Sequence, residues 1–290
     1  MNLLFLTFGP NIKNHYQANF AILSFLPYLP EGHRICVYTD YPQFYQHLHE
    51  RVTTIAVTKE QFTDWEGPHR FFWRVKIKAI EHLIQQFPTQ PVMYLDSDVF
   101  LYRNPQELSQ QLAAGKAFMH VCEGKLSELR SKTEKRMWQQ VKGMDFGRFK
   151  LAEHHHMWNA GVVMVPAQKN QEAISLALQV CDTLCARHVT PRLIEQFALS
   201  VALEETYGLQ EAKPWIAHYW GNKDEWNERI SQFFLESYLQ GLTLAQDIAR
   251  VQQFDYKPLA LVKRPKNTRK RLMNVVDRLF PVKPETFIEE

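Results

Sequence analysis

Short apolar runs alternate with stretches of helical spacing through the first half of the chain. Residues 3–8 form a run without polar alternation, as is typical of a parallel strand covered on both faces. Further strands are predicted at 34–39, 52–57 and 92–95. Residues 14–28 and 71–86 space their apolar side chains as helices do, and the second of these helices has an expected inner stripe of Trp73, Ile77, Ile80 and Ile84. This order of strands and helices predicts a doubly wound sheet with right-handed crossovers.

The second half of the chain is less regular. The predicted elements are strands at 117–121 and 159–165 and helices at 168–187 and 193–207. The polar stretch 123–156 has the composition of an insertion over one face of the sheet. We therefore expect one α/β domain over residues 1–255, followed by a tail over residues 256–290.

The composition is that of a soluble globular protein: 45% of the 290 residues are hydrophobic and 22% are charged. No run approaches the ~20 apolar residues that span a bilayer, and the N-terminus lacks the basic region and cleavage site of a signal peptide. Four scattered cysteines do not make a disulfide framework. These features predict a reduced chain in the cytoplasm.

The net charge of +3 is unevenly distributed. Residues 263–272 hold six basic side chains and no acidic one, so that 28 basic residues face 31 acidic ones in the remainder. The body of the protein is therefore slightly acidic, which argues against a nucleic acid as its partner.

Two carboxylates follow the apolar run at 92–95, in the sequence Asp96-Ser97-Asp98. In extended chain the spacing of two residues places Asp96 and Asp98 on one face, and ligands of open α/β sheets bind at this end of a strand. Neighbouring carboxylates repel each other unless a cation lies between them. Hard oxygen ligands suit Mg²⁺ or Mn²⁺, whose remaining positions can take diphosphate oxygens.

Two other interpretations of this motif remain open. One is a solvated acidic turn without a ligand. The other is a phosphohydrolase in which Asp96 attacks a phosphoryl group. The second is disfavoured because the phosphatase motif usually ends the first strand of its domain, whereas three predicted strands precede Asp96.

Four segments in order resemble motifs of GT-A fold glycosyltransferases and of glycosyltransferase family 8, the glycogenin and lipopolysaccharide galactosyltransferase group. Residues 94–99 (YLDSDV) resemble the Asp-x-Asp (DXD) motif, and residues 158–165 (WNAGVVMV) resemble the Asn-Ala/Ser-Gly strand. Residues 195–199 (EQFAL) are similar to the acid-Gln helix start, and residues 218–223 (HYWGNK) to the C-terminal His-x-x-Gly segment. The resemblance covers residues 1 to about 225 and implies a Rossmann-like mixed, mainly parallel sheet flanked by helices, with a C-terminal helical tail.

The resemblance also implies roles for individual residues. The implied ligands of Mn²⁺, with Mg²⁺ as the alternative, are Asp96, Asp98 and His218. The implied donor-binding residues are Thr7, Phe8, Asp40, Arg74, Lys76, Asp96, Ser97, Asn159, Ala160, Gly161 and Lys223. The implied catalytic residues are Asp98, Asn159, Glu195 and Gln196. A buried, satisfied histidine is the alternative for His218, and a solvated helix face is the alternative for Arg74 and Lys76, since Lys78 is equally available. The chain departs from the family at Phe197, where an acid is usual, and at Asp224, where a lysine is usual and Lys223 precedes it.

The implied reaction is transfer of a sugar from a nucleotide diphosphate sugar, expected to be a UDP-sugar, to a glycan or lipid-linked envelope acceptor. Inversion and retention both stay open. The alternative is a catalytically silent module that binds nucleotide sugars. The run at 153–156 (EHHH) is interpreted as a polar loop or part of an acceptor site, because consecutive side chains point apart and disfavour a three-histidine metal site.

The tail carries a second pattern. Its apolar residues form one helical stripe beside the basic cluster of residues 263–272, namely Leu272, Met273, Val275, Val276, Leu279 and Phe280. This pattern predicts a basic amphipathic helix that binds an anionic membrane, peripherally at its inner face. The alternative is a C-terminal helix packed on its own domain or on a partner.

Overall fold

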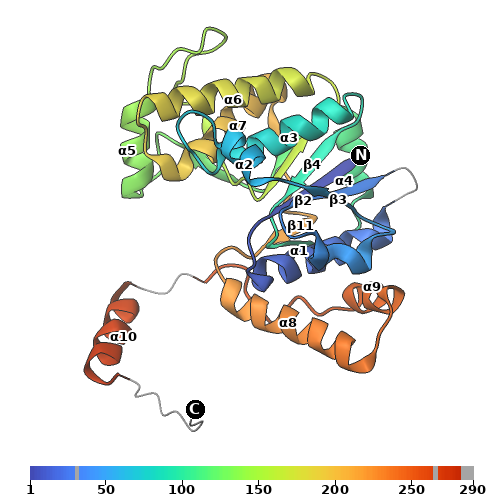
Figure 1. Cartoon of the computed structure of the whole chain (residues 1–290). Helices are drawn as coiled ribbons and strands as arrows, with labels where there is room; N and C mark the ends of the chain where they lie inside the picture. The colour runs from blue at the N-terminus through green and yellow to red at the C-terminus, as the bar shows by residue number, and fades with distance from the viewer. Residues whose placement is uncertain (30–32, 264–266, 282–290) are drawn as a thin grey trace.

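A computed structural model describes residues 1–29, 33–263 and 267–281 (Figure 1). In this part of the chain the central sheet has seven strands. Their order across the sheet is β10 (Leu209–Glu211), β6 (Ala117–Met119), β9 (Val162–Val165), β4 (Val92–Leu95), β1 (Asn2–Thr7), β2 (Arg34–Thr39) and β3 (Thr53–Ala56). Only β9 runs antiparallel to its neighbours β4 and β6. The mixed, mainly parallel sheet expected from the sequence is therefore confirmed.

Helices cover both faces of this sheet (Figure 1). On one face lie α2 (Lys59–Glu66), α3 (Arg74–Gln86), α6 (Asn170–Ala186) and α7 (Ile194–Tyr207), and on the other α1 (Ile12–Phe25), α8 (Lys223–Gln240) and α9 (Leu244–Gln252). The remaining helices are α4 (Gln106–Ala113), α5 (Lys132–Val141), α10 (Asn267–Leu279) and the short 3₁₀ helices η1 (Leu26–Tyr28), η2 (Pro42–Leu48) and η3 (Pro191–Leu193).

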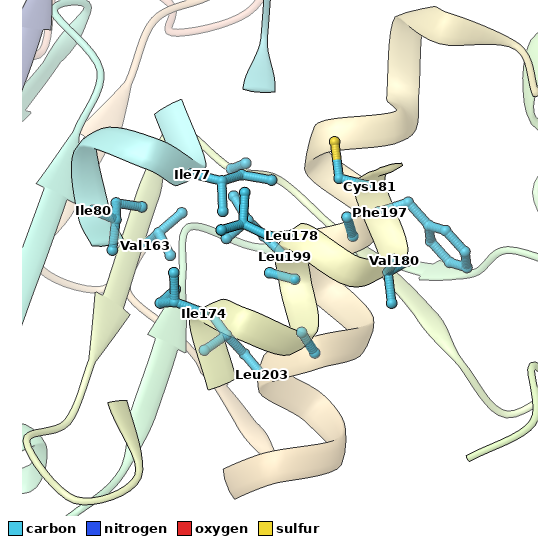
Figure 2. Close-up of a cluster of buried hydrophobic side chains, with 14 of the residues drawn as sticks. Ile77, Ile80, Val163, Ile174, Leu178, Val180, Cys181, Phe197, Leu199 and Leu203 are labelled. Carbon is cyan, nitrogen blue, oxygen red and sulfur yellow. The ribbon is translucent and has the colours of Figure 1, made fainter. Parts of the chain in front are cut away.

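The two faces of the sheet bury separate hydrophobic cores. Successive side chains of β1 alternate between them, so that Leu4 belongs to one core and Leu3 and Phe5 belong to the other. Figure 2 shows the first core, where side chains of α3, α6 and α7 meet Val163 of β9. Each fully buried aliphatic side chain of this kind contributes about 1.5–3 kcal/mol to folding. This packing fixes α3 and α7, which both carry candidate site residues.

The expected inner stripe of α3 is correct at three of its four positions. Ile77, Ile80 and Ile84 are fully buried. Trp73 is 51% exposed, and its assignment to the core was wrong. The helix begins only at Arg74, so Trp73 precedes the first helical turn and is not held on the inner face.

Two small two-stranded sheets were not predicted. In one, β5 (Val99–Leu101) pairs antiparallel with β11 (Ile216–His218). In the other, β7 (Cys122–Lys125) pairs with β8 (His156–Trp158). The polar stretch 123–156 thus begins in β7, forms α5 and ends at the start of β8, the partner strand of β7. The first turn of α5 has a capping box formed by Ser131 and Glu134.

The chain beyond residue 255 remains in contact with the domain up to Lys263. Tyr256 stacks on Phe100 with ring centroids 4.4 Å apart, and Gly221 pairs with Val262 in a parallel bridge. In α10 the apolar side chains are exposed, from 42% at Val276 to 67% at Leu279. Within the described ranges, every helix is too short or too polar to cross a lipid bilayer.

Candidate active site

A cavity of about 270 Å³ opens at the carboxyl ends of β1 and β4. Because these strands are parallel, with Phe5 opposite Leu95, the chain leaves both of them at the same edge of the sheet. The polar side chains that line the cavity are Thr7, Asn14, Lys76, Tyr94, Asp96, Ser97, Asp98 and Lys223. The predicted position of the site, at the end of the strand that precedes Asp96, agrees with this cavity.

Asp96, Asp98 and His218 lie together, with one ligand atom of each within 4.8 Å of the others. The small sheet explains how residues so far apart in sequence meet. His218 pairs with Val99 in the β5–β11 ladder, and the Tyr219 N–H donates to the carbonyl of Asp98 at 3.1 Å. The side chains of Asp98 and His218 are 3% and 5% exposed, so that both polar groups have been taken out of water.

The imidazole of His218 is oriented by Asn159. The Asn159 Oδ1 atom accepts hydrogen bonds from the Gly161 N–H at 3.1 Å and from His218 Nδ1 at 2.9 Å. With Nδ1 donating to Asn159, the other ring nitrogen, Nε2, lies 3.3 Å from Asp98 Oδ2, where it donates in the charged ring and presents a lone pair in the neutral ring. When the ring is neutral, two acceptor atoms face each other at this distance and require a cation between or beside them, and Nε2 is then ready to ligate a metal.

The charges around Asp98 agree with this requirement. Lys223, at the start of α8, places Nζ 2.9 Å from Asp98 Oδ2. Burial alone would raise the pKa of Asp98, but the neighbouring His218 and Lys223 hold this pKa well below its ordinary value. The carboxylate therefore stays charged and can serve as a metal ligand. Two carboxylates and one imidazole form a donor set that fits a divalent cation.

Gly161 lets the backbone approach the ring of His218. A Cβ atom at position 161 would lie 2.2 Å from His218 Cε1, well inside van der Waals contact. The same short segment therefore supplies both the amide that orients the ring and the space that the ring occupies. This accounts for the sequence Asn159-Ala160-Gly161 at the entrance to β9 without any contact to a ligand.

Lys76 forms a buried ion triad with Asp96 and Glu195. Its Nζ lies 3.2 Å from Asp96 Oδ1 and 3.1 Å from Glu195 Oε1, and it donates to the Ala160 carbonyl at 3.2 Å. Burial would lower the pKa of Lys76, but the two carboxylates raise it above its ordinary value. Burial raises the pKa of Glu195 against the opposing effect of Lys76. The Tyr94 hydroxyl also donates to Asp96 Oδ1, at 2.7 Å, so that this oxygen is fixed from two sides.

The structure separates the three basic residues among which the sequence could not choose. Lys76 lines the cavity, whereas Arg74 forms a two-point ion pair with Asp182 and also donates to the Trp65 carbonyl. Lys78 pairs with Glu81 on the same helix. Among the residues that line the cavity, α3 thus contributes only Lys76 as a cation.

The other predicted donor-binding residues lie in or beside the cavity. Thr7 and Phe8 line it, and the Thr7 hydroxyl hydrogen-bonds the Tyr45 hydroxyl at 2.8 Å. Ser97 lines it too and donates to Gln17 Oε1 at 3.1 Å. The carboxylate of Asp40 accepts the Gly9 N–H at 3.0 Å and so shapes the loop that follows β1.

Gln196 belongs to a second cavity, of about 880 Å³. Its Nε2 donates to Glu123 Oε2 at 3.0 Å, and Asn159 Nδ2 donates to the other oxygen of Glu123 at 3.4 Å. Asn159 lines this cavity while it orients His218, so one side chain connects the second cavity with the contact partner of Asp98. Arg130, Arg192 and the 43% exposed Trp220 are also part of its lining.

Sequence reasoning missed the aromatic wall of the first cavity. Phe72 and Trp73 are 43% and 51% exposed and line it, and Phe8 packs edge-on against Phe72 with centroids 5.8 Å apart. The signal was present as three consecutive aromatic residues, 71–73, ahead of a helix. A helix cannot bury three neighbouring side chains on one face, so at least one of them had to face elsewhere.

The chain matches no protein-family model and no curated protein. Solved structures with a similar course of the chain include two of one galactosyltransferase and one of a xylosyltransferase. The galactosyltransferase LgtC, in complex with donor and acceptor sugar analogues, gives a TM-score of 0.49 at 15% identity, covering 73% of both chains. An active-site mutant of LgtC gives 0.47 at 14% identity, covering 73% of this chain and 72% of the other. Mouse xyloside xylosyltransferase 1, without ligand, gives 0.45 at 11% identity, with coverage of 73% and 85%. At these scores and identities the chemistry of this chain has to be derived from its own residues.

Proposed function

We propose that this protein is a metal-dependent glycosyltransferase that moves a sugar from a nucleotide diphosphate sugar, expected to be a UDP-sugar, to an acceptor hydroxyl group. The observation that carries the proposal is the contact of Asp98 with His218, in which a buried carboxylate and a buried imidazole oriented by Asn159 face each other beside a cavity lined by Lys76 and Lys223. Such a site is suited to a divalent ion and an anionic ligand together. The four ordered sequence motifs support the same function.

Asp96, Asp98 and His218 would hold the ion. An imidazole ligand favours Mn²⁺, with Mg²⁺ as the alternative. When bound, the ion supplies positive charge to the oxygens of the departing nucleoside diphosphate. Lys76 and Tyr94 hold Asp96 through Oδ1, and Asn159 holds His218, so that the ligands do not have to reorganise when the ion binds.

Lys223 is the cation that we assign to the diphosphate. Its side chain is 48% exposed and lines the cavity, whereas Lys76 is buried within its ion triad. A fixed ammonium group at this position stabilises negative charge as it develops on the leaving group. Phe8, Phe72 and Trp73 supply an apolar wall for the nucleobase, and Thr7 and Asp40 lie at the strand ends where a nucleoside would be held.

The second cavity is assigned to the glycan or lipid-linked acceptor. Trp220 offers an exposed aromatic face on which a sugar ring can pack, and Arg130, Arg192 and Glu123 offer polar contacts. Gln196 borders this cavity, but an amide is too poor a nucleophile to form a glycosyl intermediate. Glu195 is 8% exposed and directed at Lys76, so we assign it to holding the triad.

A phosphohydrolase with Asp96 as nucleophile is the second candidate, and a silent nucleotide-sugar-binding module is the third. The position of Asp96 after β4 favours a ligand over a nucleophile, because a phosphatase motif usually ends the first strand of its domain and three strands precede β4 here. The test is a thermal-shift screen of UDP-, GDP- and CDP-sugars with and without Mn²⁺. Stabilisation by one of them that needs Mn²⁺ supports a donor site, and turnover of the sugar nucleotide separates the enzyme from the silent module.

The proposal divides the chain into a catalytic domain over residues 1–255 and a tail over residues 256–290, of which residues 256–263 pack on the domain and α10 is assigned to the membrane. The apolar side chains of α10 are exposed, for example 65% at Leu272 and 67% at Leu279, and the segment 263–272, which overlaps the start of the helix, holds six basic residues. This combination favours an anionic lipid surface, where a lipid-linked acceptor would also lie. Co-sedimentation with anionic vesicles should be lost when residues 263–290 are deleted, and should be absent with neutral vesicles. Equal sedimentation of the full and truncated chains would contradict a role of the tail.

A further inference from the structure

A second polar cluster lies at the far ends of two elements that lead away from the candidate active site. Asn159 directly follows β8, and Glu195 lies in the first turn of α7. At the opposite end of these elements, His154 and His155 precede β8, and Glu205 lies near the end of α7. Ten residues of helix separate Glu195 from Glu205, which corresponds to about 15 Å. The cluster is therefore distinct from the site around Asp98.

The three side chains converge on one point. Glu205 Oε1 lies 3.0 Å from His155 Nε2 and 3.9 Å from His154 Nε2, and one ligand atom of each residue lies within 4.8 Å of the others. In a tetrahedral site with zinc–ligand bonds of about 2.1 Å, neighbouring ligand atoms are about 3.4 Å apart. The two measured separations lie on either side of this value, so that small side-chain adjustments would complete the site.

The buried histidine of the cluster is held in a way that permits metal binding. His155 Nδ1 lies 3.2 Å from the Ala152 carbonyl oxygen and 3.1 Å from the Ala152 nitrogen. When Nδ1 accepts from the Ala152 N–H, Nε2 is protonated and donates to Glu205. When Nδ1 instead donates to the carbonyl, Nε2 is a lone-pair ligand with the orienting partner typical of metal-bound histidines. The backbone of Ala152 thus satisfies either tautomer.

We propose that His154, His155 and Glu205 bind a zinc-class divalent cation at a structural site separate from the Mn²⁺ site. Two imidazoles with one carboxylate suit Zn²⁺ better than Mn²⁺ or Mg²⁺, in contrast to the oxygen-rich set at Asp96 and Asp98. His154 is 67% exposed, which gives the ion a path from solvent. The ion ties the turn before β8 to the end of α7, and both elements lead to residues of the active site.

A neighbouring pair of residues attaches β8 to α7 without an ion. His156 Nδ1 lies 2.7 Å from Glu204 Oε1, and the His156 N–H donates to the other oxygen of Glu204 at 3.1 Å. This pair anchors the first residue of β8 on α7 by itself. Loss of the zinc-class ion is therefore expected to loosen the turn at 154–155 without unfolding β8, so that the variants below remain folded.

The test is isothermal titration of Zn²⁺ into the full-length, tag-free, chelator-treated chain that carries Asp98→Asn, so that the Mn²⁺ site is disabled. We expect one equivalent of Zn²⁺ to bind and to raise the midpoint of thermal unfolding. Adding His154→Ala should weaken this binding by at least about tenfold, whereas His49→Ala, which removes a similarly exposed histidine (76% against 67%), should not change it. The far-ultraviolet circular dichroism of His154→Ala should match that of the parent.

Titration with Co²⁺ supplies a second readout that reports the ligands themselves. A visible absorption spectrum characteristic of four-coordinate Co²⁺ with nitrogen and oxygen ligands should appear in the Asp98→Asn chain and be absent after His154→Ala. Absence of Zn²⁺ binding by the Asp98→Asn chain, or undiminished binding after His154→Ala, would overturn the proposal. Because the Mn²⁺ site is already disabled in this chain, neither outcome bears on the glycosyltransferase activity.

Discussion

His218 donates from Nδ1 to Oδ1 of Asn159 at 2.9 Å, and this contact decides which ring nitrogen faces Asp98. We expect Asn159→Ala to lower the affinity for Mn²⁺ by about 10- to 100-fold, because the ring loses both its tautomer and its orientation. Calorimetric titration of Mn²⁺ measures the change. Thr243→Ala, which removes a helix cap on α9, is the control and should lower stability by about 1 kcal/mol while Mn²⁺ affinity stays the same. Unaltered affinity in Asn159→Ala would show that the amide does not set the ring.

Gly161→Ala tests the close packing of the backbone on His218. The added Cβ would lie 2.2 Å from Cε1, so the ring must move away from Asp98 and Mn²⁺-dependent activity should fall to background. Gly147→Ala is the control, because its positive φ of 76° strains an alanine, which the backbone of Gly161 does not, while its Cβ would meet no atom within 4 Å. It should cost only about 1 kcal/mol of stability and leave activity unchanged. Full activity in Gly161→Ala would mean that the ring has no fixed role.

Lys76→Met should be strongly destabilising, by about 3–5 kcal/mol in chemical denaturation, because it leaves Asp96 and Glu195 without their common cation. The double variant Lys76→Met with Glu195→Gln should recover part of this loss, since one of the two buried charges is then removed. Lys125→Met breaks an exposed pair with Glu128 and should change stability by no more than about 1 kcal/mol. Equal effects of the two lysine substitutions would disprove the buried triad.

Trp73→Ala should weaken donor binding while Mn²⁺ binding alone is preserved. Loss of one aromatic face from the cavity is expected to cost about 1 kcal/mol or more, which is roughly a fivefold rise in the dissociation constant of a nucleoside diphosphate. Tyr238→Ala, at an 82% exposed aromatic residue of α8, should have no effect. If both variants bind the nucleotide as the parent does, the aromatic wall is not the nucleobase site.

Local patterns in the sequence predicted the parts of the fold that depend on local physics. The buried strands β1, β2 and β4 were visible as uninterrupted apolar runs, and α3 was visible because its apolar side chains repeat with the period of a helix. The carboxylates Asp96 and Asp98 were found for the same reason, since they end an apolar run. Trp73 was misplaced because periodicity does not mark the residue at which a helix starts.

The remaining parts depend on contacts between distant segments. His218 was identified only through a motif. Its proximity to Asp98 results from pairing of the short strands β5 and β11, and a strand of three residues is too short to show a clear hydrophobic pattern in the sequence. Arg74 and Lys76 could not be distinguished until α3 was packed on the sheet and on α6. The cluster of His154 and His155 could not be recognised without Glu205, which lies 50 residues from His155 along the chain. No local signal contains such a pairing.

The most direct test of the central claim is Mn²⁺-dependent turnover of the sugar nucleotide that stabilises the protein, measured for the parent chain, Asp98→Asn and the exposed control Asp255→Asn. The account predicts turnover in the parent and in Asp255→Asn that is lost with a chelator and restored by Mn²⁺. Asp98→Asn should show only background turnover at every Mn²⁺ concentration, because the charged ligand facing His218 is missing. Parent-like, Mn²⁺-dependent turnover in Asp98→Asn would contradict the account.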